Sequence, residues 1–154
     1  MSPDTIGTLL PLFAGLPLLV AGILITTGHR LRLHAIVNIA TMLVMLAAAC
    51  GLVYHFWSTD GGTIAHQVGP WPPGVAIPFV ADMFTALMLA VTLLLTVVSI
   101  WFAQASRAAN SQYFAPLVLI LSTGVNGALL TADLFNLFVF LEVMLLPSYG
   151  LYVL

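Results

Sequence analysis

The sequence predicts an all-α integral membrane protein, a helix bundle of about five transmembrane helices with its N-terminus outside the cell. Of its 154 residues, 62% are hydrophobic and 5% are charged, whereas soluble domains have about 45–50% apolar and roughly 25% charged residues. A helix needs about 20 residues to cross a hydrocarbon core of ~30 Å. Five apolar stretches approach or reach that length, so most of the chain is expected to lie in the bilayer.

The five stretches are predicted as helices over residues 6–26, 35–57, 79–102, 114–130 and 134–154, which together form a single transmembrane domain over residues 1–154. The first is expected to stay in the membrane rather than act as a signal peptide, because residues 1–4 contain no basic n-region. Pro11 and Pro17 are expected to bend this helix. Neighbouring helices or water must then satisfy the carbonyls that the prolines free.

The three arginines predict the orientation of the bundle. Arg30 and Arg32 lie in the connection 27–34, and Arg107 lies in the connection 103–112. The long Gly/Pro-rich connection 58–78 carries Asp60 and no lysine or arginine. Basic loops favour the cytoplasm, so the N-terminus is predicted outside. The connection 131–133 is very short, which predicts an antiparallel hairpin of the last two helices with Asp133 as helix N-cap.

Several classes of function find no support in the sequence. Three arginines and no lysine exclude the basic patch of a nucleic-acid-binding protein. The single cysteine, Cys50, cannot form an intrachain disulfide. The motifs of nucleotide, dinucleotide, zinc and acyl-transfer sites are absent from the sequence. We therefore expect no cofactor, no metal site and no nucleic-acid partner.

Glu142 is the leading candidate for a functional residue. It follows Asp133 by nine residues, which at 1.5 Å per residue places it roughly 13–14 Å into the membrane, near the middle of the core. Acids at this depth are costly to insert and usually face a bundle interior or a wet cavity. A proton-relay or ion-path role is the main interpretation. The alternative is a structural glutamate that is hydrogen-bonded to a neighbouring helix.

Two further residues of the last predicted helix bear on Glu142. On the face of Glu142, only Tyr149 has a polar tip, so a partner must come from another helix or from water. Pro147 clashes with the carbonyl of Val143 and should open the helix just past the glutamate. The freed carbonyl could hold water beside Glu142, or the proline could serve only to bend the helix for packing.

Other polar residues have mainly structural interpretations. Asp82 either caps the third predicted helix or lines an outer vestibule. The small-residue spacing of Thr123, Gly127 and Thr131 predicts a close helix–helix contact, and Asn38 and Asn126 are expected to hydrogen-bond across helices.

The segment 130–143, which reads LTADLFNLFVFLEV and is followed by Ser148 and Tyr149, resembles the fifth-helix signature of the D subunit of the Mrp-type multisubunit Na⁺/H⁺ antiporters. These proteins are related to the antiporter-like subunits of respiratory complex I. The segment 69–76 together with Asp82 resembles the loop before the third helix of the same subunit, and weaker similarity covers the whole chain. Pro147 departs from the pattern, in which a small residue is expected.

The resemblance implies a non-enzymatic, secondary-active transporter subunit of a prokaryotic cell membrane that exchanges protons for Na⁺ together with other subunits. It also implies that Glu142 is the functional glutamate, paired in the family with a lysine of the seventh helix. The chain has no lysine, so we expect it to be the N-terminal portion of a longer subunit, or a split or truncated product. The alternatives are a proton-pumping subunit of the complex I or hydrogenase type, and a non-conducting scaffold subunit.

Overall fold

The computed structural model describes residues 3–59, 62–69, 76–107 and 109–154. Of the features predicted from the sequence, Asp60 and most of the segment 69–76 lie outside these residues. The elements follow one another as α1 (Pro3–Leu9), α2 (Leu12–Thr26), α3 (Leu31–Ser58), β1 (Ile64–Val68), β2 (Ile77–Ala81), α4 (Met83–Ala105), α5 (Phe114–Leu130) and α6 (Leu134–Val153).

The helices confirm the predicted membrane bundle. Four helical segments are long and apolar enough to cross a membrane, namely Thr5–Thr26, Leu31–Ser58, Met83–Ala105 and Leu134–Val153. The fifth, α5, has 17 residues, which at 1.5 Å per residue gives about 26 Å. This length lies at the lower limit for a spanning helix.

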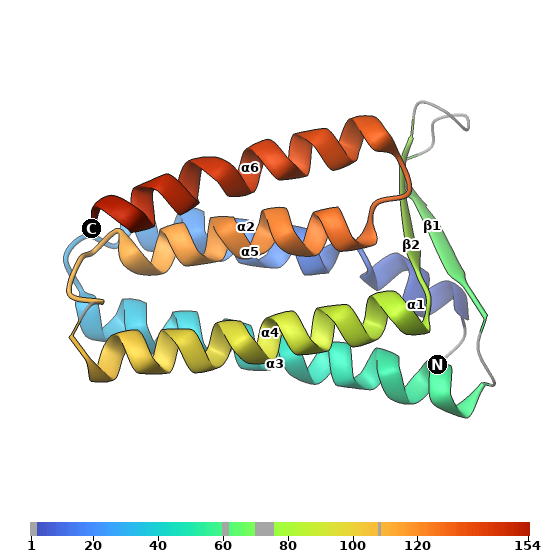
Figure 1. Ribbon diagram of the computed structural model, residues 1–154, viewed down its shortest axis with the longest axis horizontal. Helices are drawn as coiled ribbons and strands as arrows, with labels where there is room; N and C mark the ends of the chain where they lie inside the picture. Colours follow the sequence, from blue (N-terminus) through green and yellow to red (C-terminus); the bar gives the residue numbers. More distant parts are fainter. Residues whose placement is uncertain (1–2, 60–61, 70–75, 108) are drawn as a thin grey trace.

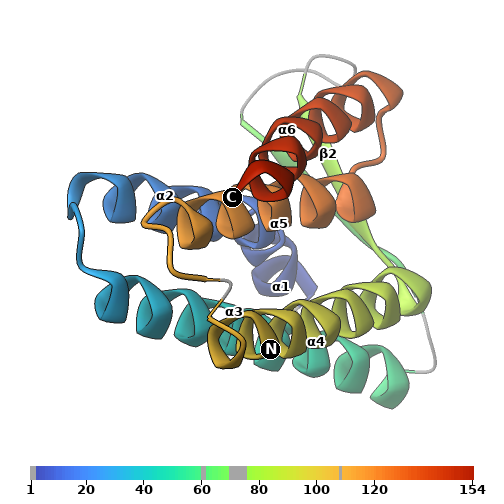
Figure 2. The same ribbon diagram turned by 60° about the vertical axis from the view of Figure 1, so that its left-hand side comes forward.

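The helices form two groups. Helices α2, α5 and α6 pack side by side, with α5 in the middle, and α3 packs mainly against α4. Figure 2 shows the α3–α4 pair beneath the other three helices. A continuous core joins the two groups through fully buried side chains such as Leu10, Met42, Leu89 and Leu119.

Pro11 divides the first predicted helix into α1 and α2. Its ring removes the amide hydrogen that would bond to the Gly7 carbonyl, and that carbonyl accepts instead from the backbone N–H of Leu10 at 3.1 Å. Pro17 is buried inside α2, which continues past it. The expected proline distortion is therefore strongest at Pro11.

A β-hairpin occupies part of the long Gly/Pro-rich connection, for which we predicted no strand. Strands β1 and β2 are antiparallel, with Ile64 opposite Ala81 and Val68 opposite Ile77. In β2, Phe79 and Ala81 are buried and alternate with less buried residues. The predicted start of a helix at residue 79 was wrong, because the uninterrupted apolar run hides this two-residue period. Helix α4 starts only at Met83.

The two ends of the bundle differ in character, as Figure 1 shows. One end, here called the arginine end, carries the α2–α3 and α4–α5 connections with Arg30 and Arg107. The opposite end, here called the hairpin end, carries β1, β2 and the α5–α6 turn. Both basic connections lie at the arginine end, as the predicted orientation requires.

Helix α3 begins at Leu31 rather than at the predicted residue 35. His34 therefore belongs to the first turn of this helix.

Candidate functional site

The start of α6 is fixed at the hairpin end by a cap and by a strand. The Asp133 carboxylate accepts hydrogen bonds from the Asn136 backbone N–H at 3.2 Å and from its Nδ2 at 2.9 Å. Thr131 forms an isolated bridge with Phe79, and the Ala132 N–H donates to the Pro78 carbonyl at 3.1 Å. The predicted N-cap role of Asp133 is confirmed.

Helices α5 and α6 approach each other closely at two glycines. A Cβ atom placed on Gly124 would lie 2.7 Å from Met144 Cβ and 2.8 Å from the Phe140 carbonyl oxygen, and a Cβ on Gly127 would overlap the ring of Phe140. The close contact predicted at Gly127 is confirmed. At Gly124 a side chain would meet the backbone of α6 itself, so only glycine leaves room for α6 there. At Gly127 a side chain would instead meet the Phe140 ring.

Glu142 lies on the side of α6 that faces away from α5. Its side chain is exposed, and so are the residues that share its face, including Phe135, Phe138, Leu146 and Tyr149. Pro147 is the one residue of α6 that is buried, and the helix lies at the outside of the bundle in Figure 1. The candidate proton site thus occupies an uncovered, mainly apolar helix face.

Glu142 has no hydrogen bond or salt bridge to any residue that the structure describes. On the same face of α6, the one side chain with a polar group is Tyr149, which lies seven residues further along the helix and is 66% exposed. This agrees with the expectation that a partner must come from outside α6. The described residues bring neither a basic side chain nor a second acid to Glu142.

The other predicted site residues are separated from Glu142. Asp82 is the N-cap of α4, where its Oδ1 accepts from the Thr85 backbone N–H at 2.7 Å. The hydrogen bonds from the Thr85 backbone and side chain lower the pKa of Asp82 from its ordinary value of 3.8. Asp82 and Asp133 both lie at the hairpin end, and each is accounted for by a helix N-terminus.

A polar cluster at the arginine end was not singled out as a site from the sequence. His34 Nδ1 lies 3.1 Å from the Gln112 carbonyl oxygen, and its Nε2 lies 3.0 Å from the Thr27 hydroxyl. Asn38 follows His34 by one helical turn and is fully buried. Two polar residues four apart in an apolar helix are the signal that could have revealed this cluster.

Comparisons with known proteins add to these observations. No protein-family profile matches the chain. The chain is 39% identical over 140 residues to the D subunit of a probable K⁺/H⁺ antiporter of Rhizobium meliloti (strain 1021), which covers 88% of this chain and 26% of the relative. It is 36% identical over 141 residues to the D subunit of a Na⁺/H⁺ antiporter of Alkalihalophilus pseudofirmus, covering 90% of this chain and 28% of the relative.

Solved structures give the same result. A chain in the structure of the Mrp complex from Dietzia sp. DQ12-45-1b superposes with a TM-score of 0.89 and 53% identity, over 95% of this chain and 27% of that chain. A chain of an archaeal membrane-bound sulfane sulfur reductase superposes with a TM-score of 0.74 at 24% identity, over 97% of this chain and 30% of that chain. At that identity the second match shows a shared fold only.

The chain spans about a quarter of the length of the curated relatives that it matches. The relatives and the Dietzia structure confirm the resemblance predicted from the segment 130–143. We conclude that this membrane helix bundle is homologous to the N-terminal part of the D subunit of the Mrp antiporters.

Proposed function

We propose that the chain is part of the D subunit of a multisubunit cation/proton antiporter in a bacterial cell membrane, and that Glu142 takes up and releases protons during exchange. The observation that carries this proposal is the position of Glu142. It is the ninth residue of α6, lies on the uncovered face of that helix and has no partner among the described residues. Acids within a membrane usually face the interior of a bundle or a wet cavity and mark an ion or proton path, so we propose that another part of the assembly covers this face of α6.

The chemistry of such a site depends on what approaches it. Apolar surroundings favour the neutral acid, and a nearby cation favours the carboxylate. A basic group that approaches and leaves Glu142 would therefore load and unload a proton. The chain contains no lysine, and its arginines lie in or next to the connections at the arginine end, so we propose that this group belongs to another part of the assembly.

The test replaces Glu142 with Gln in the assembled antiporter, in membrane vesicles that hold a proton gradient. Addition of Na⁺ or K⁺ collapses the gradient in the wild-type complex, and we expect E142Q to lose most of this response while the complex stays assembled. E142D should keep part of the activity because it keeps the titratable group. L145Q is a matched control, since it adds an amide to the same face three residues away.

The outcomes separate the possible functions. Unchanged exchange by an assembled E142Q complex contradicts the proton-site role. Loss of exchange together with dissociation of the complex supports the scaffold function, for which the large uncovered apolar face of α6 is the favourable observation.

The two relatives are named for different cations, K⁺ and Na⁺. We propose Na⁺ as the exchanged ion, and a response to K⁺ alone would contradict that choice.

A further inference from the structure

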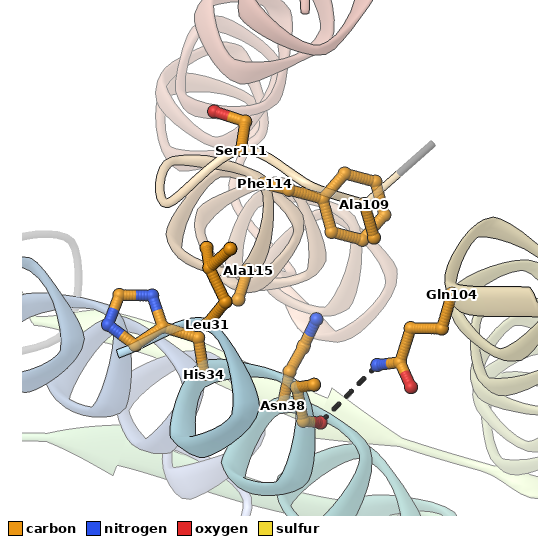
Figure 3. Close-up of a pocket in the computed structure, with 9 residues that line it drawn as sticks. Leu31, His34, Asn38, Gln104, Ala109, Ser111, Phe114 and Ala115 are labelled. Atoms are coloured by element: carbon orange, nitrogen blue, oxygen red, sulfur yellow. Dashed lines mark hydrogen bonds between the residues drawn. The ribbon is translucent and has the colours of Figure 1, made fainter. Parts of the chain in front are cut away.

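A small cavity lies at the arginine end, between α3, α4 and the start of α5. Four polar residues, His34, Asn38, Gln104 and Ser111, line it together with Phe114, as Figure 3 shows. The cavity volume, counted as the space open to the centre of a water-sized sphere, is about 10 Å³. A cavity of roughly 10–15 Å³ by this measure holds one water molecule when two or more polar partners are present.

Asn38 is the unusual member of this lining. It is the eighth residue of α3, which places it about 10 Å from the start of the helix, and its side chain is 0% exposed. Neither Nδ2 nor Oδ1 has a hydrogen-bond partner among the residues that the structure describes. Buried amide groups almost always form hydrogen bonds to protein groups or to ordered water. We therefore expect a hydrogen-bond partner for the Asn38 side chain.

In the structure, the neighbouring side chains do not supply that partner. Both ring nitrogens of His34 are occupied, by the Gln112 carbonyl and by Thr27. Gln104 Nε2 donates to the Ala35 carbonyl at 3.4 Å, which is the dashed line in Figure 3. An amide nitrogen carries two hydrogens, so one N–H of Gln104 remains for a further acceptor.

We propose that this cavity is a binding site for an ordered water molecule that links Asn38 to Gln104. The water donates to Asn38 Oδ1 and accepts from the second N–H of Gln104, so that it joins α3 to α4 within the bundle. A metal cation fits poorly, because no carboxylate lines the cavity. The inference is independent of Glu142, which lies on α6 in the other group of helices.

A density map of the full subunit in its complex, at a resolution that shows ordered water, tests the proposal. We expect a peak within about 3 Å of the Asn38 amide and of Gln104 Nε2, and we expect N38L to lose it. A map with other internal waters but no peak here would overturn the proposal. So would a direct bond from Asn38 to a protein group, or a peak surrounded by five or more oxygens at cation distances.

The pair N38S and N38A provides a second test that does not depend on a map. The two substitutions leave nearly the same volume and differ by one hydroxyl. If water occupies the site, the hydroxyl keeps a hydrogen bond to it, and N38S should unfold at a higher Tm than N38A. An equal or higher Tm for N38A would show that the cavity is dry and would contradict the proposal. Both variants should assemble and exchange ions like the wild type.

Discussion

Asn126 Nδ2 of α5 donates a hydrogen bond of 3.1 Å to the Phe13 carbonyl of α2. Phe13 precedes Pro17 by four residues, so its carbonyl is the one that the proline leaves without a helical partner. Both groups are buried, so a neighbouring helix supplies the partner that a carbonyl freed by a proline needs in a bilayer. The backbone hydrogen bond that Pro17 removes from α2 is thus replaced by one from a side chain 113 residues away.

Replacement of Asn126 by Leu should destabilise the protein by about 1–2 kcal/mol, because the Phe13 carbonyl loses its donor. In a P17A background, the introduced alanine supplies a backbone N–H to the same carbonyl, so N126L should cost distinctly less there. Thermal unfolding of the wild type, both single variants and the double variant measures this coupling. Equal costs of N126L in the two backgrounds would contradict the link between Asn126 and Pro17.

Substitution of Gly127 by Ala should force the Phe140 ring out of its position between α5 and α6, because the new methyl group would overlap that ring. Overpacking of this kind costs about 1–3 kcal/mol, and we expect lower yields of folded protein and a lower Tm. Gly22 is the matched control, since a Cβ there meets nothing within 4 Å. G22A should be neutral or should stabilise α2 slightly. Equal effects of G127A and G22A would show that the close approach does not constrain α6.

The Asp82 cap should stabilise α4 in a pH-dependent way. Because its pKa is lower in the folded protein than in the unfolded chain, the stabilisation is complete above the unfolded value and is lost as the pH falls through the folded value, below about pH 4. D82A should cost about 1 kcal/mol at neutral pH. D82N keeps an acceptor but should remove this acid dependence. The free energy of unfolding of the three proteins is measured between pH 3 and pH 7. If D82N keeps the loss of stability at acid pH, that loss arises from a group other than Asp82.

Replacement of Pro147 by Ala distinguishes the two interpretations of that residue. Pro147 is buried where α6 is otherwise mostly uncovered, which favours a packing role. We expect P147A to reduce the amount of assembled complex, with exchange per assembled complex changed less than twofold. Normal assembly together with slow exchange would instead favour the carbonyl of Val143 as a water site beside Glu142.

The sequence predicted the helices and caps well because their signals are local. Asp133 precedes an apolar run and indeed caps it, and Gly127 follows the small-residue spacing of a close contact. The β-hairpin was missed because Phe79 and Ala81 belong to an apolar run without visible alternation. Asn38 and Asn126 were both expected to bond across helices, and only Asn126 does so among the described residues. Such pairing depends on tertiary geometry that spacing alone does not contain.

The contacts between strand β2 and the start of α6 set the position of Glu142 along the bundle. Pro78 and Phe79 of β2 bond to Ala132 and Thr131, and the Phe79 ring also packs against Phe140, with ring centroids 6.3 Å apart. The start of α6 is therefore held in place by the hairpin, and each residue of α6 lies at a fixed distance from that contact. Because Glu142 is nine residues below Asp133, a one-residue insertion between the strand contact and the acid would move the carboxylate by about 1.5 Å and turn it by about 100°. The contacts of the hairpin thus determine where the Glu142 carboxyl group lies along the axis of α6.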